Sequence, residues 1–270
     1  MQAMRGAWRV NFEAYDRLLP LPGPGWAWEF KRRDPALKAA RRRTSAVRPA
    51  VVKRADGSII CRLNQRCHIA ESFGLHFIPD PALSAFETAF FWLPDVMQAS
   101  FDAVAEPATA GSNRGRGLSW AELPGEKFFL ISPGRRDKLV IRAPYYAAQL
   151  ALDADGAPVL QSACFSLRLD ASHLAAENLR LLEEFGRICE GLPARWNPPR
   201  GAAPEKLRDA LIALDGELAG VPRRRIAEAI FGAEQVCGGW DDGDESYKKR
   251  AKRLVEKGLE LMRNGYRRLL

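Results

Sequence analysis

The chain has 270 residues, of which 47% are hydrophobic, and its 41 Lys and Arg against 33 Asp and Glu give a formal net charge of +8. These values are typical of a soluble globular chain with a packed core. Because it has no run of about 18 apolar residues and no apolar stretch behind Arg5 and Arg9, neither a transmembrane helix nor a secretory signal is expected. Five cysteines at irregular spacing, none in a C-x-x-C pair, argue against a disulfide framework and favour a reducing, cytoplasmic location.

The positive charge is concentrated at the beginning of the chain. Residues 1–66 hold 15 Lys and Arg against 5 Asp and Glu, a net charge of +10, whereas residues 67–200 hold 12 against 16, a net charge of −4. Residues 201–270 hold 14 against 12, a net charge of +2. This distribution favours a polyanionic partner, which would be a nucleic acid or, with less support, an anionic membrane surface. An arginine-rich source genome is the alternative explanation for the total charge.

The first 45 residues are predicted to be helical and basic. Trp8 to Leu19 fits a short amphipathic helix, and the Pro- and Gly-rich stretch from Pro20 to Gly25 is expected to be neither helix nor strand. Trp26 to Arg43 is predicted to form one helix with an apolar edge. Its cations would form a solvated face or contact DNA phosphates, and three are candidates for such contacts: Arg41, Arg42 and Arg43.

After Pro49 the pattern changes to strands. β-branched segments at Ala50–Lys53 and Ser58–Leu63 flank Asp56-Gly57, which is the strongest short signal for a β-hairpin. Four further strands are predicted, separated by turns that contain Pro and Gly: Lys127–Ile131, Lys138–Arg142, Tyr146–Leu152 and Val159–Leu169. We expect an antiparallel meander. Strands do not alternate with long helices, so a doubly wound nucleotide-binding fold is not expected.

Helical periodicity follows from Asp170 onward. Ser172 can cap a helix that runs to Glu190, and the four prolines between Gly191 and Pro204 mark a domain boundary. Beyond it, leucines at i, i+4, i+7 and i+11 predict a helix that Pro204 begins: Leu207, Leu211, Leu214 and Leu218.

Two more helices are predicted towards the C-terminus. Arg223 to Phe231 is the second, closed by Gly232, and the stretch from Ala233 to Asp242 is a linker. The third helix runs from Asp244 to Asn264. Its apolar residues fall on one side of a helical wheel, and Ser246, Lys249, Arg250 and Arg253 fall on the other.

This order of helices is the plan of a helix-turn-helix, in which the last helix lies in the major groove of DNA. Lys and Arg suit this role because guanine offers two acceptors in that groove and phosphates need cations. The candidate DNA-binding residues here, besides the three arginines above, are Ser246, Lys248, Lys249, Arg250, Lys252, Arg253, Arg223 and Arg224. Two features oppose the interpretation: the acidic residues between Asp241 and Glu245, and an eleven-residue spacer that is long for this motif. A plain three-helix bundle with a charged face is the alternative.

Patterns for an enzyme or a metal site are weak. The glycine-rich stretch from Gly111 to Gly117 lacks the Lys-Ser/Thr and the preceding strand of a phosphate loop. Cys67-His68 has no second ligand pair at zinc spacing. We therefore expect no enzymatic activity, no cofactor and no metal.

Several strings in the sequence resemble a known family. The C-terminal ones are Leu211–Gly220 (LIALDGELAG), Arg225–Glu234 (RIAEAIFGAE), Arg250–Val255 (RAKRLV) and Asn264–Leu270 (NGYRRLL). They resemble the variant helix-turn-helix domain of proteobacterial transcription regulators, which include the RovC-type activators of type VI secretion genes and the FseA-type activators of conjugative-element excision. Gly25–Pro35 resembles the N-terminal motif that accompanies this domain, and Phe73–Phe77 with Phe91–Asp95 resembles its middle region.

The resemblance implies a cytoplasmic, DNA-binding transcriptional activator, and for RovC-like members a homo-oligomer, with a hexamer as one stoichiometry. It also implies that the long spacer belongs to the variant domain. Some relatives act instead as anti-activators that bind another regulator, which is the alternative function. We expect an α+β fold in three parts: an N-terminal basic helical segment at 1–45, an antiparallel β-rich region at 46–200 that oligomerises or binds a partner such as RNA polymerase, and an all-α helix-turn-helix domain at 201–270. Double-stranded DNA is the expected partner and a membrane is not.

Overall fold

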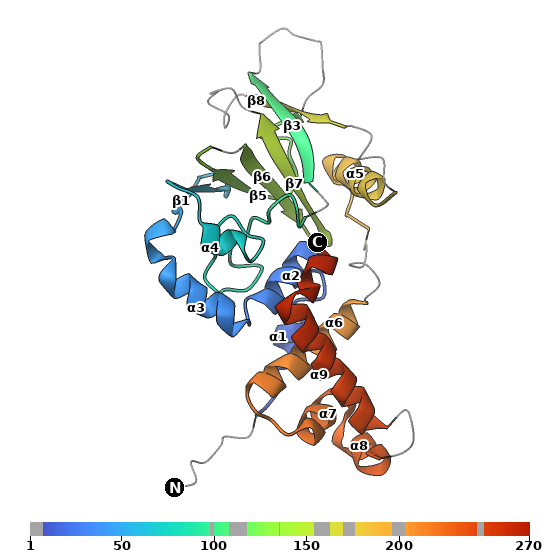
Figure 1. Cartoon of the computed structure of the whole chain (residues 1–270). Helices are drawn as coiled ribbons and strands as arrows, with labels where there is room; N and C mark the ends of the chain where they lie inside the picture. Colours follow the sequence, from blue (N-terminus) through green and yellow to red (C-terminus); the bar gives the residue numbers. More distant parts are fainter. Residues whose placement is uncertain are drawn as a thin grey trace. The chain divides into compact units, whose positions relative to one another are not determined.

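A computed structural model describes residues 8–97, 100–107, 118–134, 136–153, 163–169, 176–195, 203–241 and 246–270. The chain forms two compact units. Met1–Asp34 and Pro198–Leu269 together make the first, here called the helical unit, and Pro35–Asn197 with Leu270 make the second, here called the sheet unit. Helices and one mixed sheet build them (Figure 1), so the α+β class expected from the sequence is confirmed.

The helical unit contains elements from both ends of the chain. They are α1 (Phe12–Asp16), α2 (Gly23–Lys31), α6 (Pro204–Leu218), α7 (Arg223–Phe231), α8 (Ala233–Gly239), α9 (Tyr247–Arg263) and the 3-10 helix η3 (Gly265–Leu269). Helix α9 packs along α6 and α7, and α2 packs against η3 and α9. Helices α1 and α2 are thus part of the same compact unit as the C-terminal helices.

The N-terminal helices correct two expectations. Helix α2 begins at Gly23 and includes Pro24 in its first turn, within the stretch expected to be neither helix nor strand. Proline fits there because the first backbone N–H groups of a helix have no intrahelical partner to lose. The single helix expected from Trp26 to Arg43 is two helices, α2 and α3 (Pro35–Arg43), because the residue before a proline disfavours the helical conformation.

The core of the helical unit confirms most of the apolar residues expected for its helices, but Leu218 at the end of α6 is 44% exposed. Ala213, Ile226 and Val255, one from each of α6, α7 and α9, are fully buried together, and Trp8 packs partly buried against them. Gly258 of α9 lies so close to α6 that an added Cβ would be 2.6 Å from the carbonyl oxygen of Ala210. The two longest helices of this unit therefore cross at a point where only glycine fits.

Helix α8 lies in the stretch that was expected to be a linker. Gly232, with φ of +94°, separates α7 from α8 in a conformation that favours glycine. Val236 of α8 is fully buried against Ala227 and Ala251, with Trp240 packed beside them. The spacing of Val236 and Trp240, i and i+4, is the signal that could have predicted this helix.

The sheet unit is built on an eight-stranded sheet in the order β1-β2-β5-β6-β7-β3-β8-β4. Its strands are β1 (Ala50–Lys53), β2 (Ile59–Arg62), β3 (Ser100–Pro107), β4 (Leu118–Ser119), β5 (Glu126–Ile131), β6 (Asp137–Ala143), β7 (Tyr146–Asp153) and β8 (Ala163–Arg168). The unit also contains α3, the 3-10 helix η1 (Ser45–Val47), α4 (His68–Glu71) and α5 (Ala176–Cys189).

The pairing of these strands confirms the β1–β2 hairpin and corrects the meander. Strands β5, β6 and β7 pair antiparallel as expected, but β2 pairs with β5 in parallel, and so does β3 with β7. Parallel neighbours need a long connection, and more than sixty residues join β2 to β5. Strands β3 and β4 were not expected, and β3 lies between β7 and β8 in the sheet.

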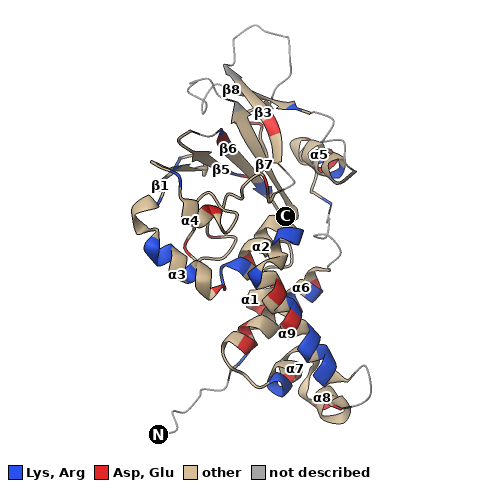
Figure 2. Ribbon diagram, in the orientation of Figure 1, with Lys and Arg blue, Asp and Glu red and all other residues tan. Residues whose placement is uncertain are grey.

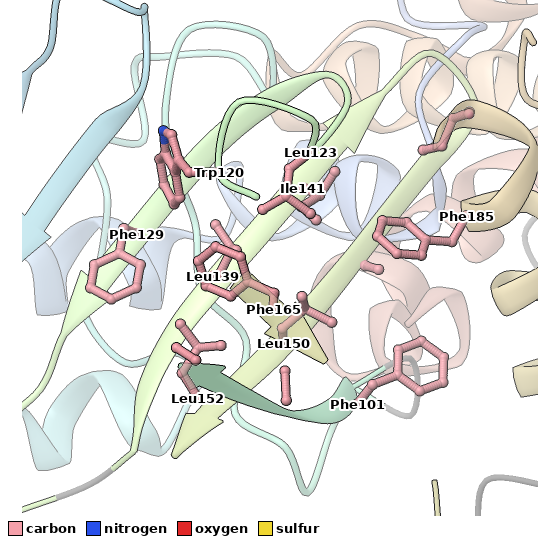
Figure 3. Packing of buried hydrophobic residues seen from close by; sticks show 14 of the residues in the cluster. Phe101, Trp120, Leu123, Phe129, Leu139, Ile141, Leu150, Leu152, Phe165 and Phe185 are labelled. Carbon is pink, nitrogen blue, oxygen red and sulfur yellow. The ribbon is translucent and has the colours of Figure 1, made fainter. Parts of the chain in front are cut away.

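One face of the sheet carries the main core of this unit (Figure 3). Leu139, Ile141 and Leu150 from the central strands lie among the aromatic rings of Phe129, Phe101, Trp120 and Phe165. Helix α5 adds Phe185 and Ile188 to the same cluster, and the ring of Phe185 stacks on Tyr146 with centroids 6.3 Å apart. The helix that the sequence places after the strands therefore covers the sheet.

Candidate nucleic-acid interface

A buried serine caps the N-terminus of helix α9. Ser246 is the N-cap, its hydroxyl accepts a hydrogen bond from the backbone N–H of Lys249 at 3.4 Å, and its side chain is buried. An N-cap serine satisfies one of the unpaired N–H groups of the first helical turn. The structure therefore places Ser246 in the helix start and away from the solvent face on which it was expected.

The cations of α9 lie on the side opposite its buried face. Ala251, Val255 and Gly258 are fully or nearly buried, whereas the basic side chains are exposed: Lys248, Lys249, Arg250, Lys252 and Arg253. Figure 2 shows Lys and Arg along the first half of α9 and at the start of α7. Five cations within two helical turns span about 8 Å of helix axis.

Lys248 and Lys252 have acidic neighbours on the surface. The Nζ atom of Lys248 lies 3.1 Å from Oδ1 of Asp241, and that of Lys252 lies 3.7 Å from Oε1 of Glu256. All four side chains are more than half exposed. Exposed ion pairs of this kind contribute about 0–1 kcal/mol, so a phosphate group can displace the carboxylates. The other acidic residues before α9, between 242 and 245, lie outside the described residues.

Arg250 lies on aromatic rings. Its guanidinium carbon is 4.2 Å from the centroid of Phe231 and 5.0 Å from that of Tyr247, so it joins the end of α7 to the start of α9. Arg224 of α7 lies 5.8 Å from the ring of Trp240 in the same way. Cation–π contacts of this geometry hold the two side chains in place.

The start of α7 follows a tight turn of four residues after α6. Gly220, with φ of +69°, reverses the chain, and the N–H of Val221 donates to the carbonyl of Gly216. Arg223 then lies 4.0 Å from Glu217, and Arg224 lies 3.5 Å from Glu228. These two arginines are exposed and belong to the same unit as the cations of α9.

Arg41, Arg42 and Arg43 lie in the last turn of α3, which belongs to the sheet unit. Leu37 and Ala40 form the buried side of this helix, and Arg42 and Arg43 are exposed. Arg41 is half-buried, and desolvation together with neighbouring Arg48 lowers the pKa of its guanidinium. The structure thus places the candidate cations in two separate units.

A second basic run, Lys31 to Arg33, is not a solvated face. The ammonium of Lys31 is buried and lies 2.7 Å from a carboxylate oxygen of Asp34. Arg32 and Arg33 both contact the fully buried carboxylate of Glu29, at 2.7 and 2.9 Å. Sequence alone gives no sign of this burial, because a run of three cations is normally solvated.

The structure also describes residues from the weak enzyme and metal-site patterns of the sequence. Cys67 is buried before α4, while the side chain of His68 is 79% exposed beside Glu71, so the two do not form a ligand pair. No group of three or more potential metal ligands is found in the part of the chain that the structure describes. None of its described helices is both long and apolar enough to cross a membrane. The glycine-rich stretch 111–117 lies outside the described residues.

A comparison with known families places this surface in context. Residues 151–270 match the family model of the RovC DNA-binding domain, described as the DNA-binding domain of a type VI secretion transcription factor. The match includes α6 to α9 with all the cations of α7 and α9 discussed above, and also β8 and α5 of the sheet unit. No curated protein matches the chain.

Proposed function

We propose that this chain is a sequence-specific transcriptional activator that reads DNA with helix α9. The match of residues 151–270 to the RovC DNA-binding domain supports this proposal. The observation that carries the proposal is the division of α9 into two sides. One side is buried against α6, α7 and α8, and the other presents the exposed cations. A helix of this kind can lie in the major groove with its first turns towards the base edges.

Within this surface we assign different roles to different cations. Lys249 and Arg253 lie one turn apart on the exposed face, about 6 Å along the axis, which corresponds to two base-pair steps. Lys248 and Lys252 flank them, and Arg223 and Arg224 are on the neighbouring helix. We assign these four to phosphates, which any sequence offers, because they lie beside the two central cations of the exposed face or on the neighbouring helix.

The test is a binding measurement with two matched arginine variants. Arg253→Ala should weaken binding to the operator by about 1–3 kcal/mol and relax the preference at one base position, as expected for a lost bidentate contact to guanine. Binding to unrelated DNA should fall much less. Arg263→Ala is the control, since Arg263 is an exposed arginine of the same helix ten residues further along, about 15 Å away.

The operator can be selected from DNA upstream of the gene and its neighbours in a gel-shift assay. If Arg253→Ala and Lys249→Ala both leave operator binding unchanged in folded protein, α9 is not the reading helix. That result would favour the alternative function, an anti-activator that binds a related regulator through the same helix.

The activator role also involves assembly and a partner. We propose that the protein is a homo-oligomer in the cytoplasm that contacts RNA polymerase through the sheet unit, with type VI secretion genes as candidate targets. Specific sites are commonly read by symmetric oligomers with paired half-sites. Light scattering should give a mass well above the 30.1 kDa of one chain, and a monomer with and without DNA would contradict the assembly.

A further inference from the structure

Residues 8–34 contribute buried contacts to three other helices of the helical unit, α6, α7 and α9. At one end, Trp8 packs against the cluster of Ala213, Ile226 and Val255, and its ring lies close to Gly216 of α6. At the other, Trp26, Trp28 and Phe30 of α2 are fully buried. The family match begins at residue 151, so these contacts come from outside the matched residues.

Lys31 closes the C-terminal end of α9. Its ammonium donates to the carbonyl oxygen of Arg263 at 3.0 Å and to that of Met262 at 3.4 Å, and it lies 5.0 Å above the ring of Tyr266. The last carbonyls of a helix have no intrahelical donor and carry partial negative charge, so a buried cation stabilises them. Asp34 supplies the opposite charge at 2.7 Å.

Arg33 binds a carboxylate side chain near the C-terminal end of α6. It binds both carboxylate oxygens of Asp215, at 2.6 and 2.8 Å, and Tyr15 donates to the same carboxylate at 2.8 Å. Burial, followed by the charge of Asp215, raises the pKa of the Tyr15 hydroxyl, so the hydroxyl stays protonated as a donor. Asp215 precedes the tight turn between α6 and α7 by less than two helical turns.

We infer that residues 8–34 complete the helical unit, and that Lys31 is a positioning residue that holds the C-terminal end of α9 and thereby sets the placement of its reading face. This inference rests on the proposed function. Lys31 does not touch DNA, and it acts through the helix that does. The buried ion pair and the two carbonyl contacts give it a defined geometry, which a solvated lysine lacks.

The experiment uses full-length Lys31→Met, with Lys53→Met as the matched control on the exposed strand β1. In Lys31→Met, amide hydrogen exchange should accelerate in residues 260–269, where the N–H groups of Asn264 and Arg267 close the last turn. Operator affinity should fall by roughly tenfold, an ordinary size for coupling between separate sites. The slope of log K against log salt should stay unchanged, because no phosphate contact is lost. The control should change neither property.

Two results would overturn the inference. The first is unchanged exchange of residues 260–269 in Lys31→Met. The second is a salt slope that falls by about 0.9, whatever the exchange shows, since this would make Lys31 a phosphate contact. If residues 203–269 lose protection as a whole while the sheet unit keeps its own, the segment is still shown to complete the unit. If the wild-type protein binds no DNA, the proposed function fails, and the exchange measurement still tests the role of Lys31.

Discussion

Two arginines of α9 that lie three residues apart, Arg250 and Arg253, have different surroundings. Arg250 lies on the rings of Phe231 and Tyr247, where its planar guanidinium joins two helices. Arg253, one turn further, is exposed on the candidate reading face. Because Arg250 packs on two rings, its replacement should mainly affect stability, whereas replacement of Arg253 should mainly affect DNA binding.

Arg250→Ala should lower the free energy of unfolding of the helical unit by about 0.5–1 kcal/mol, the contribution of a cation–π contact at an exposed site. Arg250→Lys keeps the charge but loses the planar stacking, so it should recover only part of the loss. Urea denaturation followed by circular dichroism measures both. Equal stability of Arg250→Ala and the wild type would mean that the stacked geometry contributes nothing.

At the scale of elements, the crossing of α6 and α9 depends on one glycine. An added Cβ at Gly258 would meet the carbonyl oxygen of Ala210 at 2.6 Å and the Cβ of Leu214 at 2.8 Å. The first atom is part of the backbone of α6 and the second is bonded to that backbone, so neither can move aside alone. The two helices would therefore have to separate. The exposed face of α9 would move with them, because α9 is a single continuous helix.

Gly258→Ala should therefore destabilise the helical unit by about 1–3 kcal/mol through overpacking. Gly186→Ala in α5 is the matched control. A Cβ there meets nothing within 4 Å, and Ala is the better helix former, so this variant should gain about 0.4–1 kcal/mol. Opposite signs in thermal denaturation are the expected outcome, and a neutral Gly258→Ala would show that the helices are not held at this distance.

For the whole molecule, the net charge of +8 is a poor measure of the cations available to DNA. Lys31, Arg32 and Arg33 are paired within the helical unit. Arg142 in the sheet unit is also buried, bound to Glu126 at 2.8 Å and stacked 4.4 Å from Phe128. Among the candidate DNA-binding cations, those of α7 and α9 are exposed in one unit, as are two of the three arginines of α3 in the other.

The contribution of the sheet unit to DNA binding can be measured from the salt dependence. Replacing Arg41, Arg42 and Arg43 together by Ala should weaken binding equally for all sequences and reduce the salt slope by up to about 0.9 for each lost contact. Lys53→Ala, an exposed cation of the same unit, is the control. If the slope is unchanged, α3 serves the assembly or another partner instead of DNA.

Several features of the fold depend only on the local order of residues along the chain. The β1–β2 hairpin follows from Asp56-Gly57, since Gly57 takes a φ of +81° that few other residues adopt. The two-sided pattern of α9 follows from the 3.6-residue period. Of the four leucines that this period places on the apolar side of α6, Leu207, Leu211 and Leu214 are buried, and Leu218 is 44% exposed. The basic residues on the solvent side of α9 therefore follow from helical periodicity alone.

Contacts between distant parts of the chain determine which cations are exposed and which strands are neighbours. Lys31 and Lys249 look alike in the sequence, and the difference is that Lys31 is buried against the end of α9 whereas Lys249 is exposed. Ser246 is a cap because of where the helix begins, and β3 lies between β7 and β8 because residues distant in the chain meet. Burial and strand order depend on contacts between distant segments, and periodicity and composition carry no record of those contacts.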